Sequence, residues 1–156
     1  MTALLIVEVA GERLGVSVDE VHHAVSRTSL QPLPGAHGAV AGFVSLRGRV
    51  ATAVDLAVCL DLRPSAAAER GDRPAVVIQR RGELFALLVD GIEDLFEPER
   101  DPLDGEAVEG FTPRWRHLVR ALHPDGRGLV AELDVERVLA AARRRARESE
   151  ACPTTA

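Results

Sequence analysis

The sequence predicts a mainly all-β protein of two five-stranded β-barrels, packed on each other and followed by one C-terminal helix. Three observations predict this fold. Short segments alternate apolar and polar residues, as half-buried strands do; glycine-bearing turns separate these segments; and the second half of the chain repeats the pattern of the first. Apolar residues form 46 % of the 156 residues, and each half alone would be a marginal domain. We therefore expect the halves to share a buried seam.

The chain opens with a predicted β-hairpin. Residues 4–9 form its first strand, and residues 10–12 supply the turn, since Gly11 can adopt positive φ at no steric cost. Residues 13–18 alternate apolar and polar or small side chains, which is the period-2 pattern of a half-buried return strand.

A second hairpin repeats the first. Residues 75–79 and 84–89 are its predicted strands, and residues 81–83 are its turn. When Gly11 is set over Gly82, the glutamate after each glycine, the apolar positions of the return strand and the aspartate that follows all coincide. This shift of 71 residues favours an internal duplication over chance similarity between β-rich segments.

Another pair of segments extends the repeat. Residues 50–56 resemble residues 129–135, so the second half must hold extra loop residues. Residues 63–73 are rich in alanine, charge and turn formers and are the predicted linker. Residues 93–110 hold eight acids and one arginine; we expect an irregular, solvated loop there, and a docking surface for a basic partner is the weaker interpretation.

The last predicted element is a helix. Asp134 suits its N-cap. An apolar stripe follows at helical spacing, formed by Val135, Val138, Leu139 and Ala142. The basic cluster Arg143, Arg144, Arg145 and Arg147 lies toward the C-terminal end, where the helix dipole favours cations, so it has a structural reason. We expect residues 149–156 to be a disordered tail.

Composition argues against several function classes. The net charge of −5 and the 3 % of aromatic residues disfavour nucleic-acid binding. Cys59 lies in an apolar run and is expected to be a small buried hydrophobe, and neither cysteine has metal-ligand spacing. His22 and His23 should point to opposite faces of a strand and so not share a metal ion. We expect no metal, no cofactor and no enzymatic activity, while a small barrel that binds another class of ligand stays an alternative.

The segment Leu46-Arg47-Gly48 is the strongest candidate for a functional site. Arg47 follows an apolar strand, so we expect its side chain to be partly buried and to need a hydrogen-bonding partner. Two interpretations have equal weight: a structural arginine that ties a loop to the barrel, or a residue of a binding surface. Gly48 would permit positive φ or a close backbone approach.

This segment and its surroundings resemble the chemotaxis coupling-protein (CheW) family. The resemblance rests on Leu33-Pro34, on residues 42–48 and on Asp55-Leu56, with Gly82-Glu83 and residues 133–139 in the expected order. It spans about residues 4–142. It implies SH3-like barrels within a single CheW-like domain of residues 1–148. The expected boundaries are 10–70 for the first barrel, and 1–9 together with 74–142 for the second.

The resemblance also implies a function. Members of the family are non-enzymatic cytoplasmic adaptors. They couple the cytoplasmic tip of chemoreceptors to the regulatory domain of a CheA-type histidine kinase, in arrays beneath the inner membrane. The matching receptor-binding positions are Val21, His23, Gly42, Arg47 and Gly48. The kinase-binding positions are not placed by the resemblance, and neither nucleic acid nor direct membrane insertion is expected.

Several residues depart from the family pattern. His23 stands where the family usually has an acid that would pair with Arg47, and at low pH both residues would be cationic. Ser45 replaces an asparagine, and Thr52 and His37 replace prolines. These departures leave open a decoy or regulatory module that binds one partner only.

Overall fold

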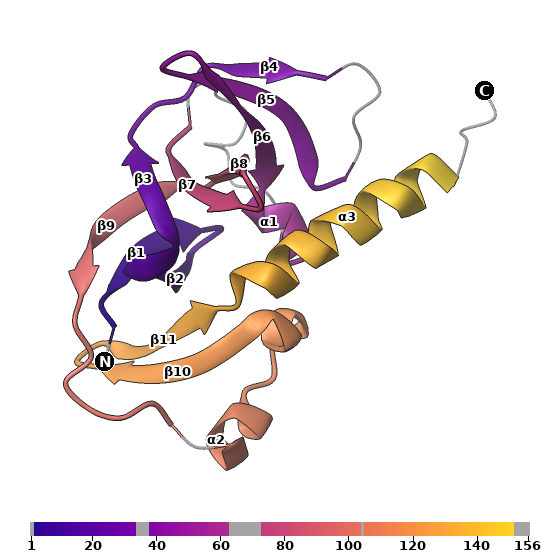
Figure 1. Cartoon of the computed structure of the whole chain (residues 1–156). Helices are drawn as coiled ribbons and strands as arrows, with labels where there is room; N and C mark the ends of the chain where they lie inside the picture. Colours follow the sequence, from indigo (N-terminus) through magenta and orange to yellow (C-terminus); the bar gives the residue numbers. More distant parts are fainter. Residues whose placement is uncertain (1, 34–37, 63–72, 104, 152–156) are drawn as a thin grey trace.

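The computed structural model describes residues 2–33, 38–62, 73–103 and 105–151 and shows two curved β-sheets with a long C-terminal helix beside them (Figure 1). We name the lobes after their sheets. The five-stranded lobe has the order β10-β11-β2-β1-β9, and the six-stranded lobe has the order β3-β7-β8-β6-β5-β4. The mainly β fold with two lobes and a C-terminal helix confirms the predicted class.

The strands of the five-stranded lobe are β1 (Leu4–Val9), β2 (Glu12–Ser17), β9 (Gly91–Phe96), β10 (Val119–Asp125) and β11 (Gly128–Leu133). Those of the six-stranded lobe are β3 (Val21–Val25), β4 (Leu30–Pro32), β5 (Val40–Leu46), β6 (Arg49–Asp55), β7 (Ala75–Arg80) and β8 (Glu83–Leu88). The helices are α1 (Leu56–Cys59), α2 (Gly105–Gly110) and α3 (Val135–Ala151), with 3-10 turns η1 (Val18–Glu20) and η3 (Arg114–Leu118).

The two lobes exchange their hairpins. The N-terminal hairpin β1–β2 lies in the five-stranded sheet, where β2 runs parallel to β11; the hairpin β7–β8 lies in the six-stranded sheet, where β8 runs parallel to β6. The expected boundaries differ from this arrangement, because residues 10–70 included β2 and residues 74–142 included β7 and β8. The resemblance had placed only the first strand in the other lobe, whereas a hairpin carries both of its strands together.

The duplication is visible in details that the sequence repeat did not specify. Under the 71-residue shift, Val18 N donates to Ala3 O and Val89 N donates to Pro74 O, both at 3.0 Å. β3 and β9 also carry a β-bulge at the same repeat position, near His22 and Glu93. The later repeat matches as well: Asp55 caps the helix after β6, and Asp134 caps the helix after β11.

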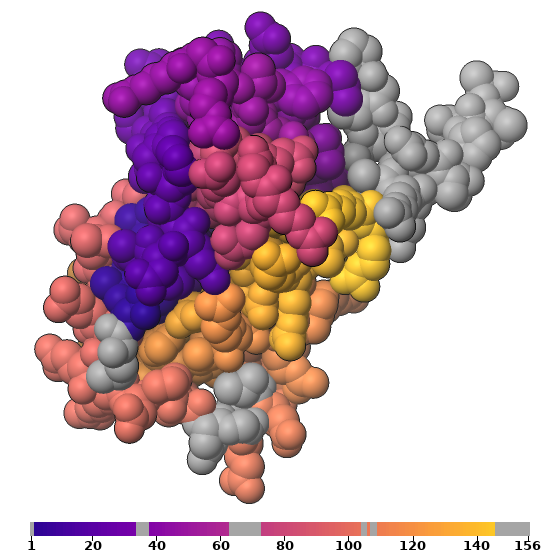
Figure 2. Space-filling model, viewed as in Figure 1, coloured from indigo at the N-terminus to yellow at the C-terminus, as the bar shows by residue number. Residues whose placement is uncertain are grey.

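The largest core is the seam between the lobes. Because β7 and β8 are apolar on both faces, alternate residues face different cores. Ala75, Val77, Ala86 and Leu88 fill the six-stranded lobe, while Val76, Ile78, Phe85 and Leu87 join the seam. On the opposite side of the seam, residues of β1, β2, η3 and α3 pack against them. The exposed side of α3, in yellow, is visible between the lobes in Figure 2. This agrees with the shared seam predicted from the small size of each half.

Helix α3 begins where the sequence places it and ends later than expected. Asp134 Oδ1 accepts a hydrogen bond from Arg137 N at 3.2 Å, as an N-cap does. The predicted apolar stripe is buried, together with Ala141. The helix continues to Ala151, so residues 149–151 are helical and not part of a tail. Residues 152–156, most of the predicted linker 63–73, and His37 lie outside the described residues.

The acidic segment is more regular than expected. Its first residues form the edge strand β9, and residues 105–110 form the short helix α2. The acidic side chains of β9 are exposed, while Ile92 packs against the seam. The run of acids therefore did not prevent strand formation. Among the described residues, no helix has both the length and the apolar character that crossing a lipid bilayer would require.

Candidate binding surface

All five predicted receptor-binding residues lie in the six-stranded lobe. Val21 and His23 belong to its edge strand β3, Gly42 to β5, and Arg47 and Gly48 to the turn between β5 and β6. His23 and Arg47 lie close enough to interact electrostatically. We call His22, His23 and Arg47 the β3 rim, because the two histidines are on that strand and Arg47 approaches them from the β5–β6 turn.

Arg47 is exposed, which corrects the expectation that it would be partly buried with a hydrogen-bonding partner. Leu46 pairs with Arg49, so Arg47 and Gly48 are the two turn residues, with φ of +47° and +83°. Two-residue hairpins of this kind need positive φ at both positions because their twist then matches that of the strands. The turn points the guanidinium into solvent, and within the described residues no carboxylate forms an ion pair with it.

Gly42 is required by the backbone. Its φ is +149°, and a Cβ added there would lie 2.1 Å from Gln31 O on the neighbouring strand β4. No side chain fits at that distance, so glycine allows β4 to pair closely with β5. Gly42 therefore shapes the surface from beneath, whereas Arg47 and the histidines are available for contact.

His22 and His23 lie together rather than on opposite faces. The bulge at this point of β3 interrupts the strict alternation of side chains, because two residues of one strand oppose a single residue of its partner. The two Nδ1 atoms are 2.8 Å apart, and the rings meet edge to face with centroids 5.0 Å apart. The prediction that they lie on opposite faces of the strand is therefore wrong. The described residues nevertheless contain no group of three or more potential metal ligands.

The surroundings of His23 disfavour its protonated form. Burial lowers the pKa of His23 below its usual value, and the neighbouring His22 and the Arg47 guanidinium lower it further. The facing residue across the ladder is Val77, which has no charge to offset this effect. His23 can therefore lose its proton without disturbing a salt bridge.

Exposed apolar side chains near the β5–β6 hairpin were not identified from the sequence. Phe43 is 38 % exposed and Val50 is 65 % exposed, while Val44 between them in the chain is fully buried. The alternation along β5 carries this information, since buried Val44 places its neighbours Phe43 and Ser45 on the outer face. Because Val50 pairs with Ser45, Phe43 and Val50 share the outer face of the β5–β6 hairpin and form an exposed apolar area there.

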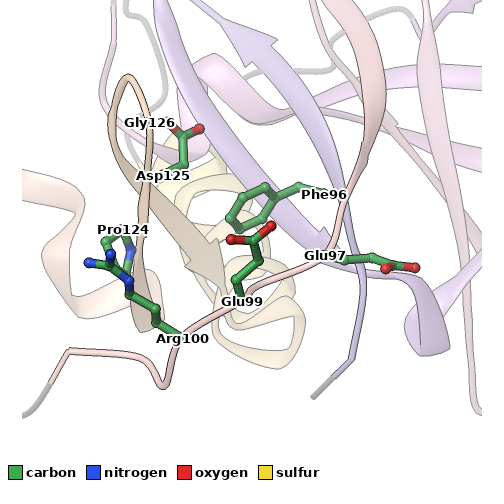
Figure 3. Close-up of a pocket in the computed structure, with 7 residues that line it drawn as sticks. All are labelled: Phe96, Glu97, Glu99, Arg100, Pro124, Asp125 and Gly126. Atoms are coloured by element: carbon green, nitrogen blue, oxygen red, sulfur yellow. The ribbon is translucent and has the colours of Figure 1, made fainter.

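The five-stranded lobe has its own open depression, of about 490 Å³ (Figure 3). It lies between the chain that follows β9 and the β10–β11 turn, with the Phe96 ring above the Glu99 side chain. Glu97, Glu99 and Asp125 line it together with Arg100, and Asp125 is also paired with Arg13. These groups form a shallow acidic surface around one aromatic ring.

Ionisable groups of β10 and β11 form a network that reaches Glu20 in η1. His123 Nε2 lies 2.9 Å from Glu132 Oε1, and Arg120 donates to Glu132 at 3.3 Å and to Glu20 at 2.9 Å. Burial raises the pKa of the Cys59 thiol to about 12, so at neutral pH it is not a nucleophile.

Comparison with known proteins gives one family and a matching fold. The model of the CheW-like domain family matches residues 3–143. None of the curated proteins compared with the chain matches it. Among solved structures, the chain is similar to the scaffolding protein TtCheW from Thermoanaerobacter tengcongensis, with 16 % identity and a TM-score of 0.70. That match covers 86 % of this chain and 84 % of the other.

Proposed function

The chain belongs to the CheW-like domain family, and on that premise we propose that it is a non-enzymatic adaptor that couples chemoreceptors to a CheA-type histidine kinase. The observation that carries this proposal is the family match over residues 3–143, which spans both lobes and the seam. An adaptor needs surfaces that stay fixed relative to each other, and the exchanged hairpins provide that rigidity. The site of action is the cytoplasmic face of a receptor array.

We assign receptor contact to the six-stranded lobe. Val21, His23, Arg47 and Gly48 lie on β3 and on the β5–β6 turn, with Gly42 supporting the turn's strand. Phe43 and Val50 supply the apolar area that a protein partner would bury. Individual contacts of this size have affinities of about micromolar, and the repeated geometry of an array raises the effective affinity.

Co-elution in size-exclusion chromatography tests this function. The purified chain is mixed with a receptor cytoplasmic-tip fragment and with the kinase regulatory domain, both encoded in the same genome. The adaptor function predicts a complex with each partner and a ternary complex with both. If neither partner shifts the elution of the chain, the adaptor function is wrong.

A decoy that binds only one partner is the second candidate. The observation that favours it is His23, since the acid that would pair with Arg47 in the family pattern is absent and the β3 rim has no carboxylate partner among the described residues. Binding to the kinase domain with no binding to any receptor fragment would support the decoy over the adaptor.

A further inference from the structure

The duplicated edge strands carry different titratable side chains at equivalent positions, basic on β3 and acidic on β9. The 71-residue shift places His22 and His23 of β3 on Glu93 and Asp94 of β9, and both strands bulge at this point. β3 and β9 each lie at the end of their sheet. The fold therefore accepts either histidines or acids at this bulge, so the backbone does not require basic side chains on β3.

The acidic strand β9 has arginines of its own chain nearby. Arg13 Nε lies 3.4 Å from Glu93 Oε2, and Arg13 Nη1 lies 3.0 Å from Asp125 Oδ2. Arg127 lines the same depression as Glu93 and Asp94. The acids of this edge thus have cations beside them, and a second copy of the chain would gain little by docking its β3 rim there.

The β3 rim has no such compensation. Asp19 accepts a hydrogen bond from Thr2, and Glu20 pairs with Arg80 and Arg120, so the two acids of η1 are engaged elsewhere. Across the ladder β7 presents apolar Val77. The charged or titratable groups that act on His23 are His22 and Arg47, which are both basic.

We propose that the β3 rim docks an acidic segment of the receptor tip, with a partner carboxylate placed between the histidine pair and Arg47; this rests on the proposed function. The 2.8 Å Nδ1–Nδ1 contact requires one ring to donate and the other to accept. The neutral pair therefore still has an Nε2–H to offer, and uptake of one proton makes both rings donors. A carboxylate favours that proton, so binding and proton uptake are coupled.

The experiment measures receptor-fragment binding by calorimetry at about pH 6 and about pH 7.5, in two buffers of different ionisation enthalpy. One linked proton permits at most about a tenfold change in affinity per pH unit. We expect binding to tighten about threefold to tenfold at the lower pH, with net proton uptake. His22→Gln/His23→Gln should bind without this pH dependence.

Charge reversal supplies the second measurement. His22→Glu/His23→Asp copies the residues of the equivalent bulge in β9, so the strand should fold, and its melting temperature verifies this. We expect affinity to fall at least about tenfold, because like charges then face each other. Arg144→Glu on the exposed side of α3 is the matched control and should leave binding unchanged.

The outcomes separate the two proposals. If the receptor fragment binds the wild type and the charge-reversed variant equally, at both pH values, the acidic-segment inference is overturned and the adaptor function stands. If no receptor fragment binds, the inference is tested separately from the adaptor function. The NMR signals of the His22 and His23 side chains are then recorded while a helical peptide rich in glutamate is added. Shifts at His22 and His23 with that peptide, but not with a lysine-rich one, support the inference, and no shift overturns it. Salt-sensitive dimerisation of the chain alone, lost on charge reversal, would assign the rim to a second copy and also overturn it.

Discussion

At Arg47 the backbone and the side chain have separable roles. Positive φ is set by the two-residue turn, while the guanidinium extends into solvent beside His23. Asparagine tolerates this backbone conformation, so Arg47→Asn should change the free energy of unfolding by no more than about 0.5 kcal/mol. Loss of an exposed charge next to a partner carboxylate should weaken receptor-fragment binding about twofold to fivefold.

The chain contains a matched control for that substitution. Arg81 occupies the same position in the Arg-Gly turn of the β7–β8 hairpin, with φ of +52°. Arg81→Asn therefore makes the same chemical change in the same kind of turn, and we expect it to leave binding intact. Chemical denaturation and calorimetry of both variants test the pair. A large loss of stability in Arg47→Asn alone would make Arg47 structural after all.

Gly42 should be the least replaceable of the candidate residues. Alanine there places its Cβ against Gln31 O on β4 and also demands a φ that side chains rarely adopt. We expect Gly42→Ala to destabilise the protein by at least about 2 kcal/mol, through displaced β4 pairing. Urea denaturation measures this. Gly48→Ala serves as the comparison, since a Cβ at Gly48 meets nothing within 4 Å and only the positive φ opposes it.

Cys59 should be inert towards thiol reagents while the protein is folded. Burial, and the nearby Asp55 carboxylate, raise the pKa of its thiol to about 12. The thiolate is the reactive form, so reaction at pH 8 requires unfolding. In a Cys152→Ser variant, we expect no labelling by an aromatic disulfide reagent until denaturant is added. Labelling of the native variant within minutes would show that Cys59 is accessible.

At the scale of elements, the equivalent helix caps should differ in importance. Asp134 caps α3 through Arg137 N, and its substitution by alanine should cost about 1 kcal/mol. Asp55 caps α1 through Ala57 N and also accepts from Arg73 at 3.1 Å, where the arginine side chain is only 7 % exposed. Among the described carboxylates, Asp55→Ala leaves that buried guanidinium with Asp90, at 3.4 Å.

We therefore expect Asp55→Ala to cost about 3 kcal/mol, close to the loss seen when a buried ion pair is broken. Thermal denaturation of the two variants gives the comparison. Equal losses would mean that Arg73 finds another partner or becomes hydrated. The double substitution of Asp55 and Arg73 should then recover part of the loss, because no unpaired charge remains buried.

Elements with a strong local pattern could be predicted from the sequence. Both glycine-turned hairpins and the start of α3 depend on neighbours in the chain, and they are found where expected. β9 was missed because its outward acids obscure the apolar contacts of Ile92. The exposure of Arg47 was also missed. The sequence holds a signal for it, since Arg47-Gly48 repeats the Arg81-Gly82 pair of a predicted turn.

The exchange of hairpins could not be predicted in the same way. A strand that is apolar on both faces shows that it is buried, but its pattern does not show which lobe it pairs with. The histidine contact depends on a bulge, which periodicity alone does not reveal. Long-range pairing and local irregularity thus decided the parts of the binding surface that the sequence left open.

For the whole molecule, the exchange predicts that the lobes unfold together. Each lobe obtains two of its strands from a hairpin that belongs to the other lobe's repeat, and both contribute to the seam core. Trp115, the single tryptophan, is 4 % exposed within that seam and reports on the five-stranded side. Its fluorescence and the far-UV circular dichroism should therefore give coincident urea transitions.

A substitution far from Trp115 tests the coupling. Val44 is fully buried in the separate core of the six-stranded lobe, and Val44→Ala should cost about 2 kcal/mol. If unfolding is cooperative, the Trp115 transition must move to lower urea by as much as the circular dichroism transition. If the lobes are independent, the fluorescence midpoint stays in place while part of the dichroism signal is lost earlier. That second result would contradict the rigid two-lobe scaffold on which the adaptor function depends.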